Sequence, residues 1–179
     1  ENAELLGDAD MRMERIYKTS SDEVEHIKGI LDKLSDSNLI VIKKEYTDLN
    51  DCVRTALDRA YKKNDVEVTL SEYADKIPIY ADEKNIIEMF VCIINNAMEA
   101  FACEQDCCRV DIKVRREYNT AYVDIIDNGE GISRMRRDKI FTRFYSTKKG
   151  GSNSGMGLYF AGKVAANHMG KISVRSKPH

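Results

Sequence analysis

Hydrophobic residues recur at every third or fourth position through the first 35 residues of the chain. This spacing predicts a long amphipathic helix from about Leu5 to Ser35 with a heptad-like apolar seam. The seam consists of Leu6, Ala9, Met13, Ile16, Val24, Ile27, Leu31 and Leu34. Its phase slips over the polar run 18–22, which indicates either a stutter or a break at which Asp22 caps a second helix. A single helix cannot bury such a seam, so we expect a partner helix, most simply from a second copy of the chain.

The pattern then alternates between strands and helices. Strands are predicted at Leu39–Ile42 and at residues 66–70, 77–81, 109–115, 121–126 and 171–175. The run 121–126 suits a buried strand, and it should form an antiparallel hairpin with 109–115 through a turn near Asn119. Helices are predicted after the caps Asp48 and Asp82, ending near Asn64 and Phe101, and from Leu158 to near Gly170, with a short helical turn between Ile132 and Lys139.

The helix after Asp82 is apolar on one face, yet it carries two successive asparagines, Asn95 and Asn96. Asparagine is a poor mid-helix residue because its side chain competes for backbone hydrogen bonds. The pair therefore either lies on the exposed outer face or presents an amide oxygen to a hard cation or a ligand.

The apolar run 121–126 ends in the polar, glycine-containing segment Asp127 to Ile132. A carboxylate fixed at the end of a strand can accept a hydrogen bond from an amino group such as that of adenine. The glycines at 129 and 131 let backbone approach a flat ligand closely, because they lack a Cβ atom. By itself the segment is more typical of a turn than of a binding site.

A second glycine-rich segment runs from Lys148 to Leu158 and leads directly into a predicted helix. Backbone N–H groups at a helix start form a phosphate cradle, and Lys148 and Lys149 favour that function over a flexible linker. The segment does not fit the Walker pattern, and no strand precedes it as a dinucleotide-binding fold would require.

Composition narrows the class of protein. The 179 residues are 42% hydrophobic and 32% charged with a net charge of −2, which predicts a folded domain that is not a general nucleic-acid binder. We find no apolar run of membrane-spanning length and no signal peptide, and the absence of an initiating Met suggests a piece of a longer protein. Five cysteines without a secretion signal indicate reduced thiols in the cytosol, and the spacing of Cys103, Cys107 and Cys108 disfavours a metal site.

Four features occur in a fixed order: Asn95–Ala100 on a helix, Asp127 to Gly131 after a strand, Phe141-x-x-Phe144, and Ser154 to Leu158. This order resembles the N, G1, F and G2 boxes of sensor histidine kinases, whose ATP-binding fold is shared with gyrase B, Hsp90 and MutL. The resemblance covers nearly the whole chain. It implies an α/β two-layer sandwich, with a mixed, largely antiparallel sheet and helices on one face.

The resemblance also implies roles for individual residues. Asn96 matches the ligand of Mg²⁺, and Asp127 matches the acid that binds the adenine amine of ATP. Gly129, Gly131 and Ile132 would lie along the base, and Phe141 and Phe144 would anchor a mobile lid from about Thr147 to Ser154. Ser154, Gly155, Met156, Gly157 and Leu158 would cradle the phosphates. Lys148 would place charge on them, which makes Asn96 and Lys148 the candidate catalytic residues.

The long N-terminal helix resembles the second helix of the family's dimerisation domain, so we expect residues 1–37 to be part of that domain and 38–179 to be the catalytic ATP-binding domain. The phosphoacceptor histidine normally lies on the first helix. His26 lies too close to Asn96 and precedes Ile27 rather than an acidic residue, so the acceptor is expected upstream of this chain. The implied protein is a cytoplasmic homodimer, attached to a membrane only through absent regions, whose partner is a response-regulator receiver domain.

Four departures keep alternatives open. Cys92 occupies the position where the ATP-hydrolysing relatives place a water-activating glutamate, and Asn153 replaces the first glycine of the G2 box. Glu99 stands where some branches have a basic residue, and the family's last strand is missing after 171–175. The alternatives are an anti-sigma-type serine kinase, which lacks the long helix, an ATP-hydrolysing clamp, and a nucleotide-binding module without kinase activity.

Overall fold

A computed structural model describes residues 42–60, 65–101, 107–146 and 155–177. From Lys43 onward these residues belong to one compact unit. The predicted helix of residues 5–35, the boundary after residue 37 and nearly all of the predicted strand Leu39–Ile42 lie outside the described residues. Ile42, which is described, is not part of a strand.

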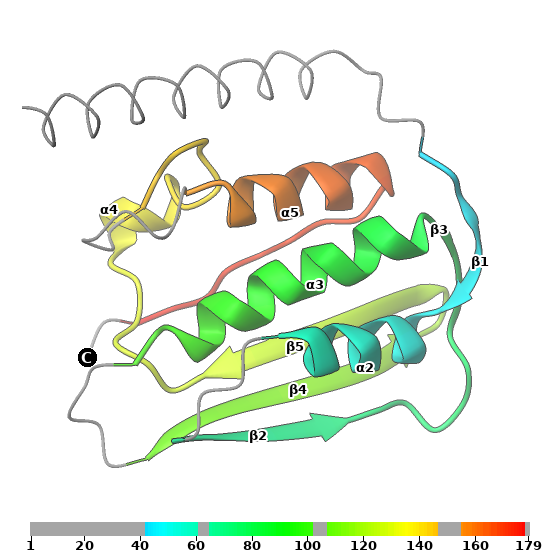
Figure 1. The fold of residues 1–179 in the computed structure, drawn as a ribbon, viewed down its shortest axis with the longest axis horizontal. Helices are drawn as coiled ribbons and strands as arrows, with labels where there is room; N and C mark the ends of the chain where they lie inside the picture. The colour runs from blue at the N-terminus through cyan, green and yellow to red at the C-terminus, as the bar shows by residue number, and fades with distance from the viewer. Residues whose placement is uncertain (1–41, 61–64, 102–106, 147–154, 178–179) are drawn as a thin grey trace, which may run out of the picture. The chain divides into compact units, whose positions relative to one another are not determined.

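The described strands form two sheets (Figure 1). In the smaller sheet, β1 (Glu45–Asp48) pairs antiparallel with β3 (Pro78–Ala81). In the larger sheet, β4 (Cys108–Glu117) lies between β2 (Val66–Ser71), which is parallel to it, and β5 (Thr120–Asp127), which is antiparallel. The predicted hairpin is thus confirmed, and the strands of the predicted mixed sheet are divided between two sheets.

The helices cover one face of the larger sheet, as predicted (Figure 1). α3 (Glu83–Met98) packs between α2 (Leu49–Arg59) and α5 (Gly157–Asn167), while α4 (Arg134–Arg137) is the predicted short turn. α2 ends before the predicted Asn64, because the backbone becomes extended at Ala60. α3 likewise ends at Met98 rather than Phe101.

The core lies between α2, α3 and the inner face of β4. Alternate residues of β4 are buried, as its sequence alternation predicts, with Val110 and Ile112 fully inaccessible. They pack in the same cluster as Val53 of α2 and Ile94 of α3, which are also fully buried. Each such side chain stabilises the fold by about 1.5–3 kcal/mol, so this cluster holds α3 firmly against the sheet.

One strand prediction is wrong and another holds only in part. Residues 121–126 form the predicted strand but are buried on one face only. Tyr122 and Ile126 of β5 are 37% and 51% exposed, because they lie opposite Arg115 and Asp111 of β4 on the face of the sheet that the helices do not cover (Figure 1). Residues 171–175 form no strand. Ile172 does pack against the core, so the alternation of that segment reports one buried face, while a strand also needs a hydrogen-bonded neighbour, and no described strand pairs with it.

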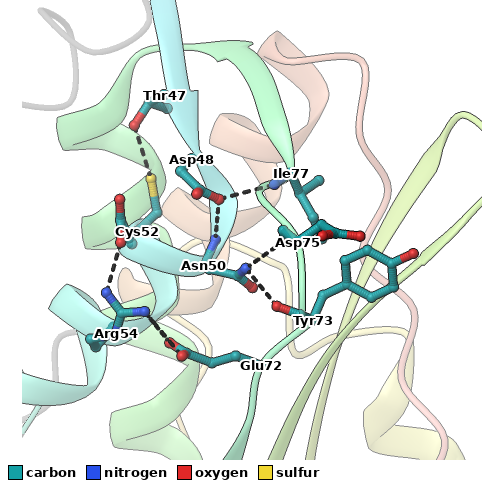
Figure 2. Close-up of polar contacts among 10 residues, drawn as sticks. Thr47, Asp48, Asn50, Cys52, Arg54, Glu72, Tyr73, Asp75 and Ile77 are labelled. Carbon is teal, nitrogen blue, oxygen red and sulfur yellow. Dashed lines mark hydrogen bonds and ion pairs between the residues drawn. The ribbon is translucent and has the colours of Figure 1, made fainter.

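Polar side chains fix the start of α2 to the loop before β3 (Figure 2). Asp48 caps the helix as predicted: its Oδ1 accepts from the N–H groups of Asn50 and Ile77, each at 3.1 Å. The buried Asn50 donates from Nδ2 to the carbonyl oxygens of Tyr73 at 3.0 Å and Asp75 at 3.1 Å. These bonds hold the start of α2 against the loop that precedes β3.

Candidate functional site

Asn96 lies in the last turns of α3 and is partly buried, not on a fully exposed outer face. Its Nδ2 donates to the carbonyl oxygen of Cys92, one turn earlier, at 2.8 Å. Because the NH₂ group is held by the helix backbone, the amide is oriented and its Oδ1 atom is the one turned away from that bond. An amide oxygen is a suitable ligand for a hard cation such as Mg²⁺.

The first turn of α5 lies beside this part of α3. A Cβ atom added to Gly157 would lie 3.7 Å from the Cβ and Sγ atoms of Cys92 and 4.0 Å from Nδ2 of Asn96. Met156, at the N-cap position, makes no side-chain capping bond, and the first-turn N–H groups have no partner within the helix. The structure therefore brings the positive end of α5 next to Asn96, as a phosphate cradle requires.

Gly155, two residues before α5 begins, packs closely against the backbone of the aromatic segment at Phe144 and Tyr145. Its φ is +66°, and an added Cβ atom would lie 2.6 Å from the carbonyl carbon of Phe144 and 2.8 Å from the backbone nitrogen of Tyr145. Both the backbone conformation and the space exclude a side chain here. The predicted F and G2 boxes are thus in direct backbone contact.

The G1 loop is anchored to the end of α3. Asp127, the last residue of β5, is exposed, and its Oδ1 accepts from the N–H of Gly129 at 3.0 Å. An added Cβ atom at Gly129 would lie 2.4 Å from the carbonyl oxygen of Ala100, and the N–H of Glu130 donates to that oxygen at 2.9 Å. The close approach that glycine permits at position 129 is therefore to the chain's own backbone.

Asn128 holds the other side of the same loop. It accepts at Oδ1 from the N–H of Arg109 at 2.7 Å and donates from Nδ2 to the carbonyl oxygen of Cys107 at 2.8 Å. Gly131 has a positive φ of 73°, and the next N–H, that of Ile132, donates to Oγ of Ser176 at 2.8 Å. The segment is both a turn and the rigid base of a site, so neither interpretation of its sequence excludes the other.

The two aromatic residues of the F box differ in their surroundings. Phe141 is partly buried and lies near Gly162 of α5, whose added Cβ atom would be 3.7 Å from a ring carbon. Phe144 is 50% exposed, adopts a φ of 62°, and its ring lies 5.9 Å from the guanidinium of Arg143. Phe144 is therefore available to contact a ligand or the adjoining segment.

Cys92 faces the start of α5 at the position of the hydrolytic glutamate. Burial raises the pKa of its thiol, and the negative charge of Glu88 raises it further. The thiol therefore stays protonated at neutral pH and cannot act as a general base toward water.

Two predicted site residues, Lys148 and Ser154, lie outside the described residues, as does the predicted lid from Thr147 to Ser154. The described residues contain no cluster of three or more potential metal-ligating His, Cys, Asp or Glu side chains. Cys103 of the cysteine group is also outside them.

The sequence analysis did not predict one hydrogen bond that links α5 to α3, the two helices of the site. His168 follows α5, and its Nε2 accepts from the N–H of Asp82, the N-cap of α3, at 2.9 Å, while its Nδ1 lies 2.8 Å from the carbonyl oxygen of Val164. Asp82 in turn accepts from the N–H groups of Asn85 and Lys43, each at 3.1 Å. The position of His168 at a helix end could have indicated a structural role, but its hydrogen-bond partner is 86 residues away in the sequence.

Comparison with known proteins places this geometry in a family. Residues 81–179 match the family model described as histidine kinase-, DNA gyrase B- and HSP90-like ATPase. The chain is 30% identical to sporulation kinase A of Bacillus subtilis over 138 residues, which are 75% of this chain and 22% of that protein. It is 31% identical to the alginate biosynthesis sensor protein KinB of Pseudomonas aeruginosa over 136 residues, 73% of this chain and 22% of KinB.

Solved structures of similar fold include the mycobacterial sensor histidine kinase MprB, with a TM-score of 0.61 at 22% identity, covering 71% of this chain and 81% of that one. The histidine kinase ThkA in its complex with TrrA gives a TM-score of 0.62 at 19% identity, covering 84% of this chain and 43% of that one. Within the described residues no helix is long and apolar enough to cross a membrane. The chain belongs to the histidine kinase-, DNA gyrase B- and HSP90-like ATPase family, and within it resembles the sensor histidine kinases.

Proposed function

We propose that this chain is the ATP-binding catalytic region of a two-component sensor histidine kinase. The observation that carries the proposal is the meeting of three motifs at one end of α3: Asn96, the start of α5 at Gly157, and the loop after Asp127, which is bonded to Ala100. The relatives named above, of which the chain covers 22% each, are a sporulation kinase and a sensor protein.

In the proposed reaction ATP supplies a γ-phosphoryl group to a histidine, and Mg²⁺ neutralises charge on the phosphates. Asn96 would hold the cation through Oδ1, since its NH₂ group is already bonded to the backbone. The exposed carboxylate of Asp127 would accept from the adenine amine. The N–H groups at the start of α5 would bind the phosphates, with Lys148 adding charge. The protein groups thus position the nucleotide and stabilise charge, which is what phosphoryl transfer chiefly requires.

The phosphoryl acceptor is proposed to be a histidine upstream of this chain, on the first helix of a dimerisation domain to which residues 1–37 contribute the second helix. The full-length protein would act as a homodimer through that domain and pass the phosphoryl group to an aspartate of a cytosolic response regulator. The complex in which ThkA was solved contains the response regulator protein TrrA, and ShkA was solved with AMPPNP, at 20% identity and a TM-score of 0.57.

An ATP-hydrolysing clamp is disfavoured by the raised pKa of Cys92, because a protonated thiol cannot activate water. The remaining alternatives are an anti-sigma-type serine kinase and a module that binds nucleotide without transferring phosphate. Autophosphorylation of the full-length protein on histidine distinguishes the proposed kinase from both.

Titration of the 179-residue chain with a fluorescent ATP analogue, with and without Mg²⁺, tests the site. Asn96→Asp should alter the Mg²⁺ dependence of binding, and Asp127→Asn should weaken binding by about tenfold or more, as expected for loss of a hydrogen bond to a charged group. Asn95→Asp is the matched control for charge on the same helix, and it should leave the Mg²⁺ dependence unchanged.

Two results would contradict the proposal. Unchanged nucleotide affinity in both Asn96→Asp and Asp127→Asn would show that the site is elsewhere. Transfer of labelled phosphate from ATP to His26 of this chain alone would show that the acceptor is not upstream.

A further inference from the structure

α4 and its surroundings carry a concentration of positive charge that the nucleotide site does not use. Three of the four residues of α4 are arginines, Arg134, Arg136 and Arg137, although the chain as a whole has a net charge of −2. None of the three side chains forms an ion pair or hydrogen bond with another residue of the described part of the chain.

Several arginines elsewhere in the described residues do form ion pairs. Those that pair with a carboxylate within 4.0 Å are Arg54, Arg59, Arg109 and Arg115. The side chains of all four are at least 41% exposed, so they could be solvated without those partners. Arg137, by contrast, is only partly exposed, and its Nε atom is buried without a hydrogen-bond partner. A guanidinium N–H removed from water and left unpaired is costly.

Arg137 lines a cavity in which a ligand could bind to its guanidinium group. Arg134 and Arg137 line a cavity of about 510 Å³ together with Asp138, Phe141 and Val174. The cavity is open to solvent and its lining is more polar than apolar, which suits a charged ligand. Asn96, Asp127 and Gly157 are not among its lining residues, and Phe141 is the predicted nucleotide-site residue that contributes to its wall.

We propose that this cavity binds the phosphate group of a small molecule through the guanidinium groups of Arg134 and Arg137. The planar, forked donors of arginine match phosphate oxygens, and a shift of the Arg137 side chain into the cavity would let its buried Nε–H bond to one of them. Asp138 would repel a bare anion, so the ligand also carries hydroxyl groups that donate to this carboxylate. Phe141 and Val174 supply an apolar wall for its carbon skeleton.

Binding of glycerol 3-phosphate to the 179-residue chain tests the proposal, with the nucleotide site first saturated with Mg²⁺ and AMPPNP. Inorganic phosphate and glycerol are the comparison ligands, because they separate the phosphate from the hydroxyl contribution. We expect glycerol 3-phosphate to bind most tightly, and the Nε–H signal of Arg137 to shift in ¹H–¹⁵N spectra.

Arg137→Lys keeps the charge but removes the Nε–H donor and the fork, so it should weaken glycerol 3-phosphate binding by about tenfold or more. Arg134→Gln should do likewise. Arg116→Gln removes an exposed arginine of β4 and is the matched control, with an unchanged dissociation constant. The affinity for the ATP analogue should stay the same in all three variants.

Thermal unfolding gives a second measurement that does not depend on those variants. Arg137→Leu removes the buried unpaired donor, so its melting temperature without ligand should equal or exceed that of the unsubstituted chain, and glycerol 3-phosphate should no longer raise it. The proposal is overturned if the compound does not bind, if AMPPNP competes with it, or if Arg137→Lys binds it as tightly as the unsubstituted chain. Equal stabilisation of the Arg137→Leu and unsubstituted chains by the compound would overturn it too.

Discussion

Two glycines near the C-terminal end of α3 should respond differently to a single added methyl group. In Gly129→Ala the new Cβ atom would lie 2.4 Å from the carbonyl oxygen of Ala100, inside the range where backbone must move. In Gly157→Ala the new atom would lie 3.7 Å from Cys92, which is ordinary van der Waals contact. The first position holds the loop to the helix, whereas the second forms the surface that we propose faces the phosphates.

The magnitude for Gly129→Ala follows from two terms. Overpacking against backbone costs about 1–3 kcal/mol, and displacing the loop loses the bond from the Glu130 N–H to Ala100, worth about 1 kcal/mol. The sum of roughly 2–4 kcal/mol corresponds to a fall in melting temperature of roughly 5–15 °C for a chain of this size. Gly157→Ala should change stability by no more than about 1 kcal/mol.

The two variants are compared by thermal unfolding and by titration with Mg²⁺ and a fluorescent ATP analogue. We expect Gly157→Ala to melt close to the unsubstituted chain and to bind the analogue about tenfold more weakly, a loss of about 1.4 kcal/mol. A melting temperature for Gly129→Ala within a degree or two of the unsubstituted chain would refute the close contact with Ala100. Full affinity in Gly157→Ala would refute the placement of phosphates at the start of α5.

Three further predictions concern stability. Burial raises the pKa of the thiols of Cys52 and Cys92, so the folded state binds their protons more tightly than the unfolded state does. The free energy of unfolding should therefore be constant below the ordinary thiol pKa of about 8.5 and fall as the pH rises above it. In urea titrations a Cys52→Ala, Cys92→Ala double variant should show a smaller fall. Asp48→Ala leaves two backbone N–H groups without their acceptor and should cost about 2–4 kcal/mol in urea unfolding, with Asp48→Asn retaining part of the stability; an equal loss in both would argue against capping. His168→Ala removes the acceptor for the Asp82 N–H and should cost about 1–3 kcal/mol, and unchanged hydrogen exchange at that N–H would contradict the bond.

The sequence alone determined the elements whose signals are local. The cap of α2 at Asp48 and that of α3 at Asp82 were predicted because a capping side chain and the N–H that it binds lie within three residues. The alternation of β4 predicted its buried face, because a strand places successive side chains on opposite sides. The family followed from four short motifs in a fixed order, which needs no knowledge of their distances in space.

Only the tertiary structure decided what depends on partners far along the chain. β5 has the composition of a buried strand but exposes one face, because the helices cover only the other side of the sheet (Figure 1). Residues 171–175 alternate without forming a strand, because no described strand lies alongside to pair with them. The sequence suggested that Gly129 approaches a ligand, but its close neighbour is Ala100. The bond between His168 and Asp82 joins elements 86 residues apart, so no local pattern could have predicted it.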